Sequence, residues 1–169
     1  MTTTTPTIQT SETFNITVDY SKSREQMVAD GQYGGGDENA YVRSYSIEGS
    51  GTISCEACYL YFDCDISLED AIREIKQAGW SPAKIEHLLS FGATYPEEQR
   101  RFEIVALGTV DPSLGVATLR AYIPSFLIFQ LIGAPIIRSI GYRNVRYGLC
   151  LSPYPQYPQR LLVIRPVAA

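Results

Sequence analysis

The C-terminal third of this 169-residue chain lacks acidic residues altogether. All 18 aspartates and glutamates lie at or before Asp111, together with only eight lysines and arginines, so residues 1–111 carry a net charge of −10. Residues 112–169 contain six arginines and no lysine, a net charge of +6. Any chemistry that needs a carboxylate must therefore take it from the first two thirds of the chain.

Long hydrophobic runs are also missing. The longest apolar stretch, residues 126–137, is interrupted by Gln130, Gly133 and Pro135, and it falls short of the about 20 residues that cross a membrane. We expect no membrane span, and the stretch to be either core or interface. The N-terminus, MTTTTPTIQTSE, lacks the basic and apolar regions of a secretory signal, so we expect no signal peptide; the location itself stays open, whether cytoplasmic or virion-associated.

Few residues are available for metal or catalytic chemistry. Cys55 and Cys58 have the CxxC spacing of half a zinc ribbon, but no second CxxC follows. Within a strand, residues three apart point to opposite faces, so we expect reduced thiols, no metal and no cofactor. The single histidine, His87, has no nucleophile beside it in a recognisable motif, so we expect a partly exposed structural histidine and no enzyme. The glycines of residues 30–40 lack the Lys-Ser/Thr of a phosphate-binding loop.

The apolar and polar pattern predicts an α+β protein with two mid-chain helices. Ser67 is a good N-cap for the first of these helices and Gly79 a good stop. Ser81 and Pro82 predict the start of the second helix, and Gly92 its end. A short helix is predicted over residues 23–29, and a charged turn or short helix over residues 96–101. Strands are predicted over residues 14–19, 41–47, 51–62, 102–110, 119–123, 146–151 and 160–165, with a hairpin turn at 48–51.

Three segments together resemble a known family. They are GWSPAKIEHLLSFG at residues 79–92, IVALG at 104–108 and RLLVIR at 160–165. This order resembles C-type-lectin-like domains, in which such a helix precedes a loop-rich, mostly antiparallel sheet that closes on an R-[FL]-x-x-V-R-type strand. More narrowly, it resembles the variable proteins of diversity-generating retroelements in bacteria, archaea and their viruses. We then expect residues 1–12 to be a disordered tail and residues 13–169 a single C-type-lectin-like domain.

The resemblance implies a fixed scaffold with a variable C-terminal surface, here residues 120–160. In that family a reverse transcriptase copies a template repeat with errors at adenines, and the product replaces the 3′ part of the gene. The implied function is receptor-like or adhesin-like binding of a macromolecule, most simply a protein. Tyr, Ser, Asn and Arg are also the residues that recognition loops prefer. The predicted ligand-binding residues are Tyr142, Asn144, Arg146, Tyr147, Ser152, Tyr154, Gln156, Tyr157 and Gln159.

An alternative function is nucleic-acid binding by the same arginine- and tyrosine-rich third, through stacking and phosphate contacts. In the ligand-binding function, the six arginines, taken as unpaired, favour an acidic partner. The whole chain is nevertheless acidic, with a pI of about 5.0 and only three lysines. Composition therefore favours a protein ligand over a nucleic acid.

Overall fold

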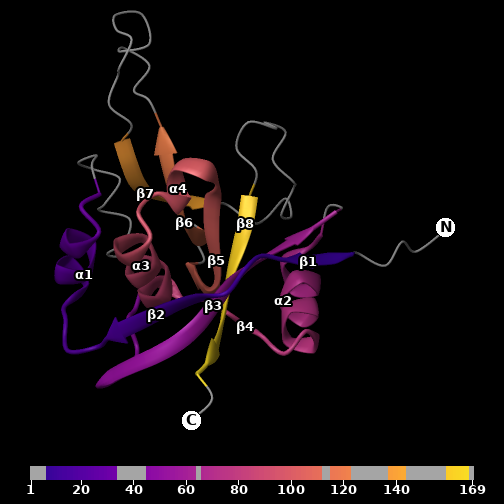
Figure 1. Ribbon diagram of the computed structural model, residues 1–169, viewed down its shortest axis with the longest axis horizontal. Coiled ribbons are helices and arrows are strands. Elements are labelled where there is room, and N and C mark those ends of the chain that lie inside the picture. Colours follow the sequence, from indigo (N-terminus) through magenta and orange to yellow (C-terminus); the bar gives the residue numbers. More distant parts are fainter. Residues whose placement is uncertain are drawn as a thin grey trace, which may run out of the picture.

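The computed structural model describes residues 7–33, 45–63, 66–111, 115–122, 137–143 and 159–167. They form a mixed α+β structure, as the sequence predicts (Figure 1). The helices are α1 (Arg24–Asp30), α2 (Leu68–Gln77), α3 (Ile85–Thr94) and α4 (Glu98–Arg101). The strands are β1 (Ile8–Thr10), β2 (Phe14–Asp19), β3 (Thr52–Phe62), β4 (Ser81–Pro82), β5 (Glu103–Asp111), β6 (Gly115–Tyr122), β7 (Ile137–Arg143) and β8 (Gln159–Pro166).

The strands form one mostly antiparallel sheet. Its order is β1-β3-β8-β5-β6-β7, with β2 also paired to β3 and β4 to β8. Only β5 and β8 run parallel; every other pairing among the described strands is antiparallel. Strands β3 and β8, about a hundred residues apart in sequence, therefore lie side by side within the sheet.

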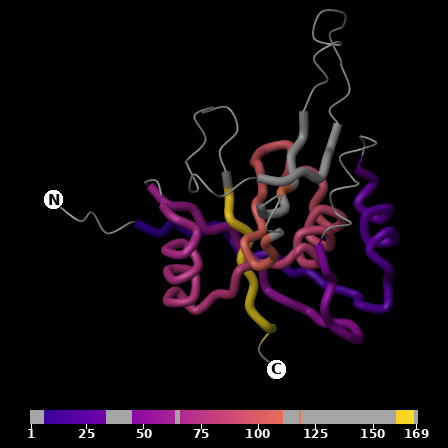
Figure 2. Tube along the Cα trace, turned by 180° about the vertical axis from the view of Figure 1, so that it is seen from behind, coloured from indigo at the N-terminus to yellow at the C-terminus, as the bar shows by residue number. Residues whose placement is uncertain are grey.

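Helices cover both faces of the sheet. Alternate residues of β3 enter two separate core clusters, Cys55 and Tyr59 with α1 and α3, and Cys58 and Leu60 with α2. Figures 1 and 2, seen from opposite sides, show α2 on one side of β8 and α1 and α3 on the other. A strand segment covered on both faces is apolar on both, which explains the buried run Ala57–Leu60 within β3.

Helix α2 has both of the caps that its sequence predicts. The Ser67 hydroxyl accepts a hydrogen bond from the Asp70 N–H at 3.1 Å. At the other end Gly79 has a φ of +81°, and the Trp80 N–H donates to the Ile75 carbonyl at 3.1 Å. This is a Schellman motif, in which a residue with positive φ lets the chain turn back on the helix.

Helix α3 begins later and ends later than predicted. Ser81 and Pro82 form β4, which pairs with Ile164 and Val163 of β8. The helix then begins at Ile85 and continues to Thr94. The predicted start was wrong because pairing with β8 outweighs the local preference of proline for the first helical turn. The predicted stop was wrong because a glycine inside a helix costs only about 1 kcal/mol, which packing can offset.

Further predictions also differ from the structure. Ile8–Thr10, inside the predicted disordered tail, pairs with β3 as β1, and Ile8 packs against the core. Residues 45–47 are not a strand, so the predicted hairpin at 48–51 is absent; β3 pairs instead with β2, which buries Ile16 and Val18. Strand β7 was missed. The predicted strand at 146–151 and loop at 152–158 lie outside the described residues.

In the part of the chain that the structure describes, no helix has the length and apolar character needed to cross a membrane.

Candidate binding surface

Two of the nine predicted binding residues lie in described strands. Tyr142 is in β7, where it pairs with Ala117 of β6, and Gln159 begins β8, where it pairs with Glu103 of β5. Strands β5 and β6 separate these two positions in the sheet, so the structure does not bring them together. The other seven, Asn144, Arg146, Tyr147, Ser152, Tyr154, Gln156 and Tyr157, lie outside the described residues.

The strand register nevertheless places the ends of the predicted variable segments. Glu103 pairs with Gln159, and Tyr122 at the end of β6 pairs with Ile137 at the start of β7. Because Leu119 pairs with Ile104, the end of β6 lies beside the start of β5. Tyr122, Ile137 and Gln159 therefore lie at one end of the sheet, which we call the Gln159 end. It is the upper end of β8 in Figure 1.

Arginines and aromatic rings stack at the Gln159 end. The Arg160 guanidinium carbon lies 4.0 Å from the centre of the Tyr61 ring and 4.7 Å from that of Phe102. The guanidinium carbon of Arg101 lies 5.0 Å from the Phe102 ring centre. We call Tyr61, Arg101, Phe102 and Arg160 the arginine–aromatic cluster. The site prediction missed it, because only the pairing of β8 with β3 and β5 brings these residues together.

The buried Tyr59 is linked to this cluster through hydrogen bonds. The Tyr59 hydroxyl donates to Glu98 Oε2 at 3.0 Å, and Glu98 Oε1 accepts from Arg101 Nη1 at 3.2 Å. Burial, followed by the negative charge of Glu98, raises the pKa of Tyr59 well above its usual value, and burial lowers that of Arg160. Tyr59 is therefore neutral at physiological pH, while an arginine stays protonated. The cluster thus holds two planar cations against aromatic rings.

The prediction that the C-terminal arginines are unpaired is wrong for Arg165. Its Nε lies 2.5 Å from Glu56 Oε2, and its guanidinium carbon is 4.4 Å from the Trp80 ring centre. The antiparallel register of β3 with β8 sets Glu56 directly opposite Arg165. One acidic residue of the first two thirds thus meets one basic residue of the last third across the sheet. This pairing weakens the argument for nucleic-acid binding.

The two described cysteines do not form a metal or redox pair. Cys55 and Cys58 are free and buried, and they belong to the core clusters on opposite faces of the sheet, as their spacing in a strand predicts. Burial raises the pKa of both thiols, that of Cys58 to about 11. The described residues contain no group of three or more His, Cys, Asp or Glu that could hold a metal ion. Cys64 and Cys150 lie outside them.

His87 is buried rather than partly exposed, with 5% of its surface accessible. Its Nδ1 accepts a hydrogen bond from the Lys84 N–H at 3.1 Å, so it caps the N-terminus of α3 from within the first turn. Burial, followed by the charge of Lys84, lowers the pKa of His87 to about 4. A neutral imidazole with its acceptor nitrogen engaged in this way has a structural role.

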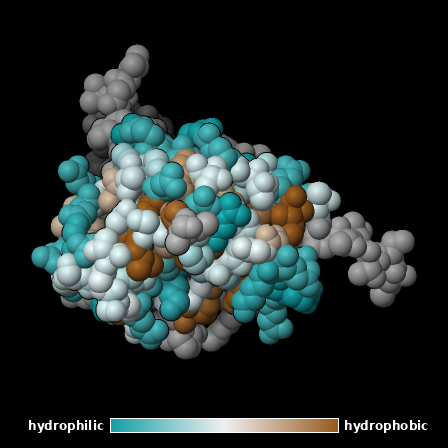
Figure 3. Space-filling view, turned by 60° about the horizontal axis from the view of Figure 1, so that its bottom comes forward, coloured by the Kyte–Doolittle hydropathy of each residue, from teal (hydrophilic) through white to brown (hydrophobic). Residues whose placement is uncertain are grey.

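One small hollow, of about 130 Å³, lies between β2, α1 and α3. Its polar groups are largely engaged with one another: Lys22 Nζ lies 2.7 Å from Asp30 Oδ2, and Asp19 accepts from Ser21 at 2.6 Å. On the view of Figure 3, apolar surface breaks into small separate patches among hydrophilic residues. Neither feature competes with the Gln159 end as a site for a large ligand.

Comparison with family models, with characterised proteins and with solved structures finds no match for this chain.

Proposed function

We propose that this chain is a ligand-binding protein with a C-type-lectin-like fold, whose C-terminal surface residues are diversified by a retroelement to change its binding specificity. One observation carries the proposal. The two segments that bear most of the resemblance, residues 79–92 and 160–165, are far apart in sequence but contact each other directly. If the two short motifs matched the family by chance, there would be no reason to expect them to contact each other.

The contact involves backbone and side chains. Ser81 and Pro82 pair with Ile164 and Val163, and the Ala83 N–H donates to the Leu162 carbonyl at 3.1 Å. The segment 79–92 is thus paired with the last strand, and that strand lies between β3 and β5 within the sheet. This supports the lectin-like arrangement, in which a helix precedes a sheet that closes on its last strand.

The location of the core also supports the proposal. The buried hydrophobic residues that the structure describes lie between Ile16 and Leu107 and from Leu161 to Val163. Hydrophobic residues outside the candidate variable region 120–160 thus already form two packed core clusters. A scaffold of this kind keeps its fold while the residues at the Gln159 end change.

The flanking DNA provides the direct test. We expect a reverse transcriptase gene near this gene, together with a near-copy of its 3′ part, about 100–150 bases long, that differs only at adenines of the template. The adenine positions would then identify which of the nine predicted residues vary. Absence of both the gene and the repeat would contradict diversification, although ligand binding by a fixed surface would remain testable.

A further inference from the structure

Two glutamates at equivalent helix positions have opposite environments. Helices α2 and α3 each have ten residues and carry glutamate at the second position, Glu69 and Glu86. Glu69 is exposed, whereas Glu86 is fully buried. One oxygen of Glu86 accepts from the Tyr20 hydroxyl at 3.3 Å, and among the described residues the other has no partner. Such a carboxyl group is costly to ionise.

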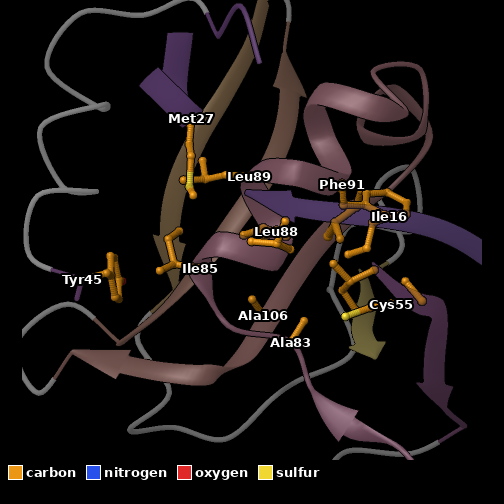
Figure 4. Packing of buried hydrophobic residues seen from close by; sticks show 14 of the residues in the cluster. Ile16, Met27, Tyr45, Cys55, Ala83, Ile85, Leu88, Leu89, Phe91 and Ala106 are labelled. Atoms are coloured by element: carbon orange, nitrogen blue, oxygen red, sulfur yellow. The ribbon is translucent and has the colours of Figure 1, made fainter. Parts of the chain in front are cut away.

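An irregular segment, residues 45–51, lies next to this carboxyl group, and we call it the strap. It has no helix or strand, but Tyr45 is buried and Ile47 is partly buried in the same core cluster as Ile85, the first residue of α3. Figure 4 shows the Tyr45 ring beside the Ile85 side chain. At the surface, Glu48 of the strap lies 3.7 Å from Lys84 Nζ.

Tyr20 connects the strap to Glu86. A Cβ atom built on Gly49 would come within 2.2 Å of the Tyr20 ring, so this ring lies directly against the strap backbone. The Tyr20 N–H also donates to the Gly51 carbonyl at 2.8 Å. The hydroxyl of the same tyrosine binds Glu86. Movement of the strap therefore changes the environment of the buried carboxyl group.

We propose that the strap closes over the first turn of α3 while Glu86 is protonated and opens when Glu86 ionises. This device is independent of the proposed ligand-binding function. Opening admits water to the carboxylate, whereas the closed state leaves one of its oxygens without a partner. Local opening of a short irregular segment costs far less than global unfolding, so the strap is the element that moves.

Among the ionisable groups around the strap, Glu86 is the one whose charge changes as the strap opens. Burial raises the pKa of Glu86 from its ordinary value of 4.5; a hydrogen bond from its own backbone N–H, the charge of Lys84 and the Tyr20 hydroxyl oppose this shift, and Glu48 adds to it. Tyr20 is neutral because burial and Glu86 raise its pKa to about 12, and Cys55 beside it has a raised pKa as well. His87, with a pKa of about 4, is neutral above that pH.

The test is hydrogen exchange of the strap amides and the Tyr20 amide over a pH series, corrected for the intrinsic pH dependence of exchange. In the wild type, we expect the opening equilibrium to increase by up to tenfold per pH unit above pH 4.5 and to level off above the pKa of buried Glu86. Glu86→Gln should give a flat profile. Glu69→Gln, the matched exposed position, should behave as wild type.

A second variant tests the Tyr20 link. Tyr20→Phe keeps the ring against Gly49 but removes the hydroxyl that stabilises ionised Glu86, so the levelling-off should move to higher pH. The proposal is overturned if the wild type and Glu86→Gln give the same profile, or if Tyr20→Phe leaves the profile unchanged. It is also overturned if core amides of β3 exchange with the same pH dependence, because the transition is then global unfolding.

Discussion

At the scale of single residues, His87 takes the place that glutamate usually has in a capping box. It is the third residue of α3, and its Nδ1 accepts the Lys84 N–H. Glutamate or glutamine at this position makes the same bond with an oxygen. Histidine differs because protonation of Nδ1 removes the acceptor, so the cap of α3 depends on pH.

The sign of this dependence follows from the lowered pKa of His87. Between pH about 4 and 6.5, His87 binds more protons in the unfolded chain than in the folded one. The free energy of unfolding therefore rises with pH across this window, and the stabilisation by neutral His87 is complete above it. We expect this change in the free energy of unfolding to be on the order of 3 kcal/mol.

Because Glu86 titrates with the opposite sign, its effect must be removed from the measurement. Urea unfolding of Glu86→Gln should therefore be compared with that of Glu86→Gln/His87→Gln over a pH series. Parallel pH profiles for the two would contradict the assignment.

Arg160 offers a second test at this scale, because both Tyr61 and Phe102 contact its guanidinium. Arg160→Ala should lower the free energy of unfolding by about 1–2 kcal/mol, since it removes stacking and the packing of the side-chain stem. Arg160→Lys should recover only part of this loss, because an ammonium group is not planar and cannot stack on the rings as a guanidinium does. Arg100→Ala is the control: Arg100 forms an exposed ion pair with Glu97 at 3.0 Å, and its loss should cost less than about 0.5 kcal/mol. Equal losses for Arg160→Ala and Arg100→Ala would show that the stack contributes nothing.

At the scale of elements, prediction succeeded where the signals are local. Ser67 and Gly79 set the ends of α2 through hydrogen bonds to residues no more than five positions away, so the sequence contains the necessary information. The start of α3 failed because β4 depends on β8, about eighty residues later in the chain. The hairpin at 48–51 failed for a related reason: β2, which precedes the glycine-rich segment, is the strand that pairs with β3.

The bulge in β5 is an element whose geometry requires a glycine. The register of β5 with β6 shifts between Ala106 and Val110, and within this interval the Gly108 N–H donates to the Ala83 carbonyl at 2.8 Å. A Cβ atom on Gly108 would lie 2.6 Å from the Pro82 carbonyl oxygen and 2.7 Å from that of Ala83. The bulge thus fixes the segment between β4 and α3 against the sheet.

Gly108→Ala should therefore lower the free energy of unfolding by about 2 kcal/mol or more, since backbone must move on both sides of the contact. Gly51→Ala is the comparison, because Gly51 has φ +70° but nothing within 4 Å of the position that a Cβ atom would take; it should cost about 1 kcal/mol from backbone strain alone. Both values are measured by urea unfolding. A smaller loss for Gly108→Ala than for Gly51→Ala would mean that β4 and β5 separate easily.

At the scale of the whole molecule, the sheet brings one residue from each of the two oppositely charged parts of the chain into contact. The chain divides into an acidic part and a basic part in sequence, but β8 inserts between β3 and β5 and brings Arg165 to Glu56. The strand pattern predicted β2, β3, β5 and β8, whereas the order of the strands requires pairings between distant segments. The candidate site, too, could be predicted from the sequence only in part. Composition indicated the C-terminal third, but only the register assembles Tyr61, Phe102 and Arg160 at the Gln159 end.

The division between scaffold and binding surface makes a last prediction. If residues 144–158 supply the ligand contacts and the core is built elsewhere, Tyr154→Ala and Tyr157→Ala should each change the free energy of unfolding by less than about 0.5 kcal/mol. Leu162→Ala, at a core position in β8 that is 1% exposed, should cost about 2–5 kcal/mol. Urea unfolding of the three variants measures both effects. If the tyrosine variants lose as much stability as Leu162→Ala, these residues belong to the core, and the C-terminal third cannot vary freely as the proposed function requires.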